Sequence, residues 1–306
     1  MGRSYPVRVV IRDVGPRDGL QPESPVSASA RVALVEALVA AGVRHVEVAA
    51  FVSPKAVPAM AEAAEVVAGL VRHPEVTYAA LVPNARGAEL ALAAGVDELT
   101  VTISASEAYN QRNVKMSTDE SVTAIEAIVG LASAGAVPVP VDAVISCAFG
   151  SPYEGEIAPG DVVALASRLA AVGAASLTYA DTTGMATPRR IDDLVDALDG
   201  QVAGVGLHLH DTRGAALVNA YAALERGIAR FDTSVGGLGG SPFAHGAGGN
   251  LATEGLGRAR RPRHRDRHRP RPPARGRHPH RLAGGPPPPS LVAHHGPRTR
   301  LATPAS

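Results

Sequence analysis

Two histidines alternate in the segment His208-Leu209-His210-Asp211. Side chains two residues apart point to the same side of a β-strand, so both imidazoles can face one divalent ion. Asp211 would either orient a ligand or cap the helix that follows. Because the pattern also fits a polar strand end with two hydrogen-bonded histidines, the metal interpretation depends on further ligands.

A carboxylate and an amide would complete the set of ligands. Asp18 follows the first apolar run, and in a closed eight-stranded barrel the first strand lies near the seventh and eighth. Asn250 is the candidate amide, although Gly248-Gly249-Asn250 also fits turn chemistry. Oxygen and nitrogen donors together suit Mg²⁺ or Mn²⁺ better than structural zinc, which prefers thiolates. We therefore expect a divalent metal cation bound by Asp18, His208, His210 and Asn250.

Charged groups at the ends of other strands would surround this metal. Arg17 precedes Asp18 and can stabilise an enolate or polarise a carbonyl. It can also form a salt bridge with Glu47 or Asp181, and both roles are compatible. Glu47 and Asp181 are not expected to be ligands. Each can position Arg17 or relay a proton, and a purely structural role stays open for both.

A glycine-rich loop, Gly236–Phe243, follows the eighth strand-like run and contains Ser241. Glycine flexibility suits a lid that closes over a substrate. A phosphate-binding loop is the rival interpretation, because backbone N–H groups there could cradle an anion.

Eight short runs rich in Val, Ile, Leu or Thr would carry these residues. Each is bounded by Gly, Pro, Asp or Asn, as expected for strands. The runs are Val7–Val14, His45–Phe51, Val76–Val82, Glu98–Ser104, Val139–Ala148, Ser176–Thr183, Gly204–Asp211 and Arg230–Gly237.

Ala-rich segments with helical periodicity separate these runs, among them Ser29–Ala41, Val57–Val71, Asp119–Ala134, Asp161–Val172, Pro188–Leu198 and Ala215–Arg226. The glycines Gly42, Gly95 and Gly135 would supply left-handed caps, and Thr187-Pro188 would begin a helix. Strict strand–helix alternation predicts an α/β fold with a parallel sheet, and eight repeats predict a (β/α)₈ TIM barrel over residues 1–254. No G-x-G-x-x-G follows the first run, which weakens a dinucleotide-binding alternative.

Composition fits an ordinary enzyme of a reducing compartment. The 306 residues are 45% hydrophobic but only 3% aromatic, so Ala, Val and Leu carry the packing. The single cysteine, Cys147, excludes an intramolecular disulfide. Neither a membrane span nor a signal-peptide core is expected, and we predict a cytoplasmic protein.

The last 52 residues, 255–306, break the strand–helix pattern. They hold 13 Arg, 11 Pro, 6 His and one acid, a net charge of 13 − 1 = +12, whereas residues 1–254 carry 17 − 28 = −11. This composition predicts a disordered basic tail. It also fits a nucleic-acid-binding arm, but we favour a reading-frame shift, because a frame-shifted reading of codons for Arg263–Arg271 gives a loop and helix start.

These motifs together resemble hydroxymethylglutaryl-CoA lyases, members of a superfamily of metal-dependent barrel lyases and synthases. The resemblance covers residues from about Val7 to Glu254. His-x-His-Asp alone is shared more widely, including by isopropylmalate and citramalate synthases. The matching segments are Val14–Gln21, Ser53–Lys55, Cys147–Gly155, Asp181–Gly184, His208–Asp211 and Gly237–Glu254.

The resemblance implies cleavage of 3-hydroxy-3-methylglutaryl-CoA to acetyl-CoA and acetoacetate. It implies that the four proposed ligands bind the metal, that Arg17 stabilises the acetyl-CoA enolate and that Glu47 and Asp181 are active-site acids. The expected partner is an acyl-CoA substrate, with no nucleic acid and no membrane, in a homodimer. Leucine breakdown and terpenoid catabolism both remain open as pathways.

The chain departs from the family in two places. Ser241 stands where the family has a cysteine, and a serine hydroxyl exchanges protons far less readily than a thiol. This leaves the metal site intact but opens the choice between 3-hydroxy-3-methylglutaryl-CoA and a related 3-hydroxy-3-alkylglutaryl-CoA. The basic tail replaces helices that in the family cover the eighth strand.

Three alternatives remain beside the lyase. A condensing synthase of the same superfamily would usually carry an additional C-terminal domain. A nucleic-acid-binding protein would use the basic tail, although the acidic body argues against a continuous basic face. A folding-defective remnant of a lyase is compatible with lyase ancestry, since loss of the covering helices would expose apolar surface.

Overall fold

The computed structural model describes residues 5–240 and 248–258. Ser241, the rest of the glycine-rich loop up to residue 247 and residues 259–306 lie outside the described residues. The segment behind the reading-frame interpretation and most of the predicted basic tail are therefore outside them too.

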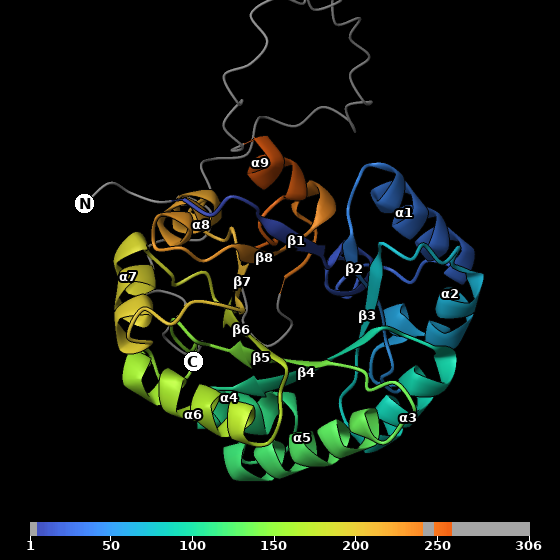
Figure 1. Cartoon of the computed structure of the whole chain (residues 1–306), viewed down its shortest axis with the longest axis horizontal. Coiled ribbons are helices and arrows are strands. Elements are labelled where there is room, and N and C mark those ends of the chain that lie inside the picture. Colours follow the sequence, from blue (N-terminus) through green and yellow to red (C-terminus); the bar gives the residue numbers. More distant parts are fainter. Residues whose placement is uncertain (1–4, 241–247, 259–306) are drawn as a thin grey trace, which may run out of the picture.

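Eight parallel strands close into one barrel in chain order, and the last strand pairs with the first (Figure 1). The predicted TIM barrel is thus confirmed. The strands are β1 (Val10–Asp13), β2 (His45–Ala50), β3 (Thr77–Leu81), β4 (Glu98–Ser104), β5 (Val141–Ser146), β6 (Ser176–Asp181), β7 (Val205–Leu209) and β8 (Arg230–Thr233).

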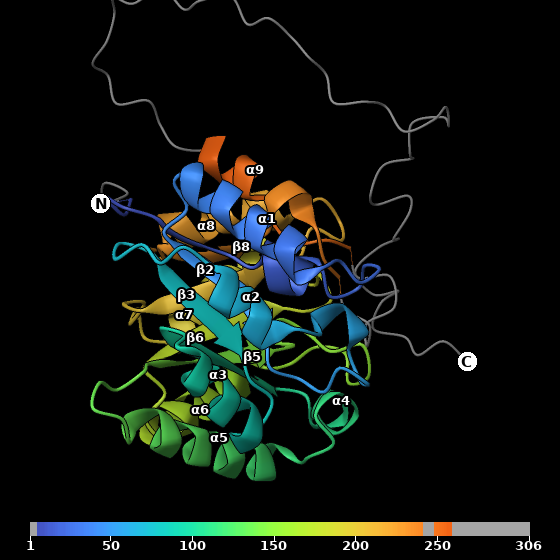
Figure 2. The same ribbon diagram turned by 90° about the vertical axis from the view of Figure 1, so that its right-hand side faces the viewer.

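Helices surround the barrel, and the apolar core lies largely between them and the strands (Figures 1 and 2). Within the described ranges no helix is long and apolar enough to cross a membrane. The last helix continues past Glu254, where we expected the catalytic domain to end. The helices are α1 (Ala28–Ala40), α2 (Ala63–Gly69), α3 (Ala85–Ala94), α4 (Glu107–Asn113), α5 (Thr118–Ser133), α6 (Pro159–Ala171), α7 (Pro188–Ala197), α8 (Ala216–Glu225) and α9 (Thr253–Arg258).

The single helix predicted over Val57–Val71 is wrong. A 3₁₀ turn, η2 (Pro58–Met60), precedes α2, and Glu62 between them is left-handed with φ 61°. Arg31 of α1 explains the break, because its guanidinium donates hydrogen bonds to the carbonyls of Ala59 and Ala61. A contact between helices therefore takes carbonyl groups that a continuous helix would use itself.

Smaller differences lie at element ends. Gly42 and Gly95 have the expected positive φ, but Gly135 does not, so the left-handed cap predicted there is wrong. Thr187 caps α7 as expected, with its hydroxyl accepting from the Arg190 amide. The first strand begins at Val10 rather than at residue 7.

Inside the barrel, towards the amino ends of the strands, lies a buried ionic network centred on Arg12 of β1. The guanidinium of Arg12 lies 2.8 Å from Asp232 of β8, 2.9 Å from Asp142 of β5 and 3.1 Å from Glu98 of β4. Burial alone would raise the pKa of Asp142, but Arg12 and Arg230 outweigh it and lower this pKa to about 2. Arg12 thus contacts three carboxylates at once, and together with Arg230 it keeps Asp142 charged.

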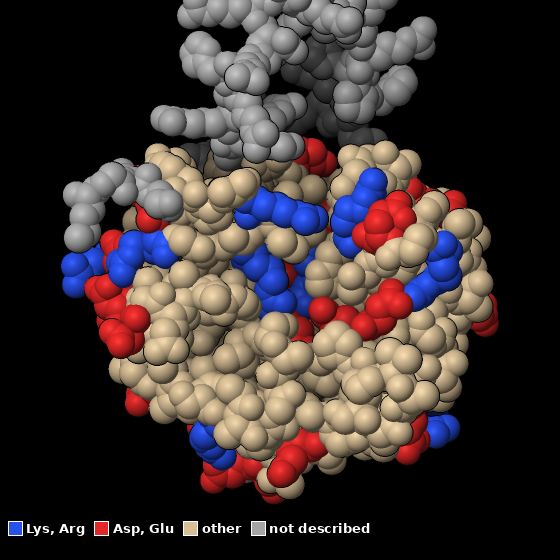
Figure 3. Space-filling model, in the orientation of Figure 1, with Lys and Arg blue, Asp and Glu red and all other residues tan. Residues whose placement is uncertain are grey.

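This network reaches the face of the molecule seen in Figure 1. His45, Glu98 and Arg230 are the first residues of β2, β4 and β8, and the side chains of His45 and Arg230 are partly exposed. Figure 3 shows basic and acidic side chains gathered in a hollow at the centre of the same face. The barrel interior at the amino ends of the strands is therefore occupied by charged side chains, whereas apolar side chains pack between the strands and the surrounding helices.

Replacing Arg12 should be among the most destabilising changes in the barrel. Arg12→Met keeps much of the side-chain volume but leaves three buried carboxylates without their shared cation. We expect the free energy of unfolding, measured with urea, to fall by about 3–5 kcal/mol. Arg86→Met is the control, since the Arg86–Glu89 pair is exposed and its loss should cost at most about 1 kcal/mol. Equal losses in the two variants would contradict the role given to Arg12.

Candidate metal centre

Asp18, His208 and His210 come together at the carboxyl ends of the strands. One possible ligand atom from each lies within 4.8 Å of the other two. His208 is on β7, His210 directly follows that strand, and their rings lie 5.2 Å apart. The Nε2 atom of His208 is 3.8 Å from Oδ2 of Asp18. The sequence-based grouping of these three residues therefore matches the structure.

Asp18 reaches the cluster from a turn rather than from a strand end. Strand β1 ends at Asp13, and one π-helical turn, η1 (Gly15–Gly19), carries Arg17 and Asp18. We expected both residues at the end of the first strand, but that strand ends before η1 begins. The extra turn projects their side chains over the mouth of the barrel beside β7.

Asn250 joins the cluster by means of a backbone bridge to His210. Its side-chain nitrogen donates to Oδ2 of Asp18 at 2.8 Å and to the carbonyl of Leu238 at 3.0 Å. Its carbonyl oxygen, Oδ1, is buried and has no hydrogen-bond partner among the described residues. The same holds for Nδ1 of His210.

These unpartnered atoms fit a cation. Buried acceptors normally have a partner, and a polar atom without one in a dry site costs free energy. A carboxylate, two imidazoles and an amide provide oxygen and nitrogen donors without thiolates. The residues present therefore fit a divalent metal, as the sequence predicted.

The two histidines differ in their surroundings. Burial lowers the pKa of His210 to about 4, and neighbouring His208 acts in the same direction. Burial also lowers the pKa of His208, but its hydrogen bond with Asp232 and the charge of Asp18 outweigh burial, so the net shift is upward. His210 is consequently neutral at neutral pH, the form in which imidazole binds metals.

Arg17 is fixed by two carboxylates. Its Nε donates to Oε2 of Glu47 at 2.5 Å, and its Nη1 donates to Oδ1 of Asp18 at 2.6 Å. The salt bridge with Glu47 that we considered is present. Burial raises the pKa of Asp18, but the opposing effect of Arg17, followed by that of the histidines, is larger and lowers it overall. Arg17 is thereby held as a preorganised cation beside the cluster.

Asp181 is a buried acid that is held mainly by backbone amides. It is the last residue of β6, and its Oδ1 accepts a hydrogen bond from the Ala186 amide at 2.9 Å. Its Oδ2 is buried without a partner among the described residues. Burial raises the pKa of Asp181 to about 7. A carboxyl group with this pKa can take up and release a proton near neutral pH.

The described part of the glycine-rich loop packs against the same cluster. Gly239 has φ 121°, and a Cβ at this position would collide with the side-chain amide of Asn250. Only glycine therefore permits this close approach. Ser241, two residues later, lies outside the described residues, so the structure does not test its predicted role.

Two further residues escaped the sequence analysis. Asp232 of β8 lies 3.1 Å from Nδ1 of His208, and Arg12 of β1 holds Asp232. The available signal was a charged residue within an otherwise strand-like run. Asp211, by contrast, accepts from the Ala216 amide and so caps α8, one of its two predicted roles.

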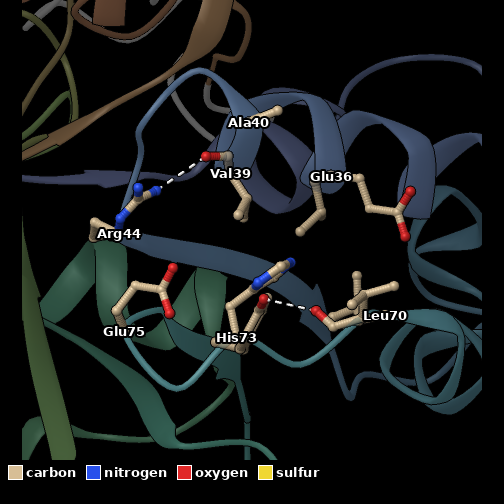
Figure 4. Close-up of a pocket in the computed structure, with 10 residues that line it drawn as sticks. Glu36, Val39, Ala40, Arg44, Leu70, His73 and Glu75 are labelled. Atoms are coloured by element: carbon tan, nitrogen blue, oxygen red, sulfur yellow. Dashed lines mark hydrogen bonds between the residues drawn. The ribbon is translucent and has the colours of Figure 1, made fainter.

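A separate surface pocket lies away from this centre. Its volume is about 420 Å³, and it opens between α1 and the segment leading into β3 (Figure 4). Arg44 and Tyr78, two of its lining residues, lie at the starts of β2 and β3, whereas the metal cluster lies at the opposite strand ends. The pocket does not contribute to the centre described here.

Comparison with known proteins gives consistent matches. Residues 8–268 match the family model described as HMGL-like. A Pseudomonas aeruginosa protein named 3-hydroxy-3-isohexenylglutaryl-CoA/hydroxy-methylglutaryl-CoA lyase is 45% identical over 254 residues, which is 82% of this chain and 84% of that protein. Hydroxymethylglutaryl-CoA lyase YngG of Bacillus subtilis is 40% identical, with 82% and 85% covered.

A solved structure provides a further match. An HMG-CoA lyase of A. baumannii, in complex with coenzyme A and 3-methylmalate, superposes with a TM-score of 0.78 at 37% identity. The match covers 82% of this chain and 83% of that one.

The pKa of Asp181 predicts a pH-dependent stability. A carboxyl group whose pKa rises on folding, here from 3.8 to about 7, stabilises the fold at low pH, and this contribution is lost as the pH rises through about 7. In metal-free protein, Asp181→Asn should therefore flatten the fall in melting temperature between about pH 4 and pH 8. Asp193→Asn, a surface acid paired with Arg189, should keep the parent profile. A parent-like profile in Asp181→Asn would refute the assignment.

Proposed function

Because the chain belongs to the HMGL-like family, we propose that it is a carbon–carbon lyase that cleaves 3-hydroxy-3-methylglutaryl-CoA to acetyl-CoA and acetoacetate. The observation that carries the proposal is identity of 40–45% to enzymes named for this reaction, over most of both chains. The clustering of Asp18, His208 and His210 at the barrel mouth supports it independently.

The reaction needs three kinds of group. The tertiary hydroxyl loses its proton, its oxygen forms the new ketone, and the neighbouring carbon–carbon bond breaks to leave the enolate of acetyl-CoA. The enolate then takes up one proton to give acetyl-CoA, so the overall reaction neither consumes nor releases a proton. A divalent cation, when bound by Asp18, His208, His210 and Asn250, supplies positive charge that makes the hydroxyl proton easier to remove. A protein group must accept that proton, and another must stabilise the enolate.

Asp181 and Arg17 fit these two tasks. Asp181 has an unpartnered oxygen and a pKa near neutral pH, so we propose that it accepts the proton of the tertiary hydroxyl. Arg17 presents a guanidinium that Glu47 and Asp18 hold in place, which suits it to the developing enolate. Glu47 acts as the positioning residue for Arg17.

The choice of metal and surroundings forms part of the same proposal. The mixed oxygen and nitrogen donors support Mg²⁺ or Mn²⁺. The single cysteine, Cys147, is buried and unpaired, which supports a reducing compartment such as the cytoplasm. A homodimer is proposed on the family resemblance, and light scattering of the purified protein would measure its mass.

Two acyl-CoA esters that differ in the alkyl group at carbon 3 are candidate substrates. The P. aeruginosa relative is named for both the methyl and the isohexenyl substrate. Ser241 replaces the cysteine of the family's loop, so we propose that a longer 3-hydroxy-3-alkylglutaryl-CoA is the alternative substrate. Assays with both acyl-CoA esters distinguish them by their kcat/KM values.

Loss of one metal ligand should abolish most of the activity. With Mg²⁺ or Mn²⁺ present, the protein should release acetyl-CoA and acetoacetate in equal amounts, and EDTA should stop the reaction. His210→Ala should lower kcat/KM by more than tenfold, about 1.4 kcal/mol or more of transition-state stabilisation. His73→Ala, a change in the separate pocket, is the matched control and should keep parent activity. No turnover of either ester by folded, metal-loaded protein would rule out the lyase, and condensation of a 2-oxo acid with acetyl-CoA would indicate the synthase instead.

Arg17 should act on the transition state rather than on folding. Arg17→Lys keeps the charge but loses the planar fork that contacts Glu47 and Asp18 together. We expect kcat to fall by about 100-fold, the loss typical of one oxyanion donor. The melting temperature should move by less than about 4 °C. Arg226→Lys is the control, because Arg226 also pairs with two carboxylates but at the surface. Normal kcat with a large loss of stability would assign Arg17 a structural role only.

A further inference from the structure

Asp232 stands between the ionic network and the metal centre. On β8 it is in register with Arg12 of β1 on one side and with His208 of β7 on the other. Its side chain is buried, with 4% exposed. Asp232 therefore connects two groups that the lyase mechanism above leaves separate.

Both oxygens of Asp232 are engaged by donors. Arg12 donates from Nε to Oδ1 and from Nη2 to Oδ2, each at 2.8 Å. Such a two-pronged contact fixes the plane of the carboxylate as well as its position. Nδ1 of His208 lies 3.1 Å from Oδ2.

This arrangement decides which nitrogen of His208 carries the proton. A carboxylate held by a guanidinium can only accept hydrogen bonds, so Nδ1 of His208 must be the donor. In a neutral imidazole the other nitrogen, Nε2, then keeps its lone pair. Nε2 is also the atom on the Asp18 side, 3.8 Å from Oδ2 of Asp18.

We propose that Asp232 is a positioning residue that holds His208 with Nδ1 protonated and its Nε2 lone pair directed at the divalent cation. This inference rests on the proposed metal centre and extends it by one residue, with Arg12 fixing Asp232 in turn. A carboxylate behind a metal-binding histidine typically contributes 10- to 100-fold to metal affinity.

The test compares two aspartates that share Arg12. Asp232→Asn keeps the shape of the side chain but offers His208 an amide in place of a carboxylate. Asp142→Asn is the matched control, since Asp142 is also buried and lies 2.9 Å from Arg12. The side chains that contact Asp142 come from β1, β6 and β8, and His208 is not among them. Mn²⁺ is titrated calorimetrically into the full chain and each variant, and His208→Ala defines the background from other histidines. Melting temperatures report the structural damage in each case.

We expect Asp232→Asn to raise the Kd for Mn²⁺ by about 10- to 100-fold. Asp142→Asn should lower the melting temperature but change this Kd by less than about threefold, because Arg12 keeps its two-pronged contact with Asp232. Unchanged affinity in Asp232→Asn, or equal loss in both aspartate variants, would overturn the inference. If the parent chain binds Mn²⁺ no better than His208→Ala, the metal centre itself is wrong, which is a separate failure.

A second measurement needs no variant and covers the case in which Asp232→Asn does not fold. Nitrogen-15 spectra of metal-free parent protein, taken at a pH where the ring is neutral, distinguish the two imidazole tautomers. We expect His208 to carry its proton on Nδ1. A proton on Nε2 would overturn the inference, since Asp232 would then not be accepting from this ring.

Discussion

The two-pronged ion pair between Arg12 and Asp232 is the contact on which the rest of the barrel depends. It lies across β1 and β8, the strands whose pairing closes the sheet. Charges in a dry interior are tolerated only when every donor and acceptor is matched. Asp142 and Glu98 are the further ion-pair partners of Arg12, and His208 is the further hydrogen-bond partner of Asp232. The closure of the fold and the orientation of a metal-binding side chain therefore share one interaction.

Neighbouring charges, rather than burial, separate the roles of the two acids at the barrel mouth. Asp18 lies beside Arg17 and the histidines, and its pKa falls. Asp181 is also buried but is held mainly by backbone amides, and its pKa rises to about 7. One carboxylate thus stays charged while the other can carry a proton. The barrel achieves this by placing Asp18 on the turn η1 after β1 and Asp181 at the end of β6.

The sequence predicted what depends on local periodicity. Short runs rich in Val, Ile, Leu or Thr located all eight strands, Glu98–Ser104 to the residue, and the two-residue spacing of His208 and His210 put both on one face. It could not place the break before α2, because Arg31 takes the carbonyls of a distant segment. Asp232 escaped notice for the same reason, since its partners lie 24 and 220 residues away in the chain.

The bridge between His210 and Asn250 has a consequence for how such an enzyme can diversify. The Asp211 amide donates to the Gly249 carbonyl, and the Leu251 amide donates to the Leu209 carbonyl, so Asn250 is fastened to the end of β7. On the other side, the Leu238 carbonyl accepts from the Asn250 side chain. Leu238 and Asn250, which stand on either side of the glycine-rich loop in the sequence, are therefore fixed by a contact with each other and by the contacts of Asn250's neighbours with β7. The sequence between these two anchors can therefore change during evolution while Asn250 and His210 keep their places.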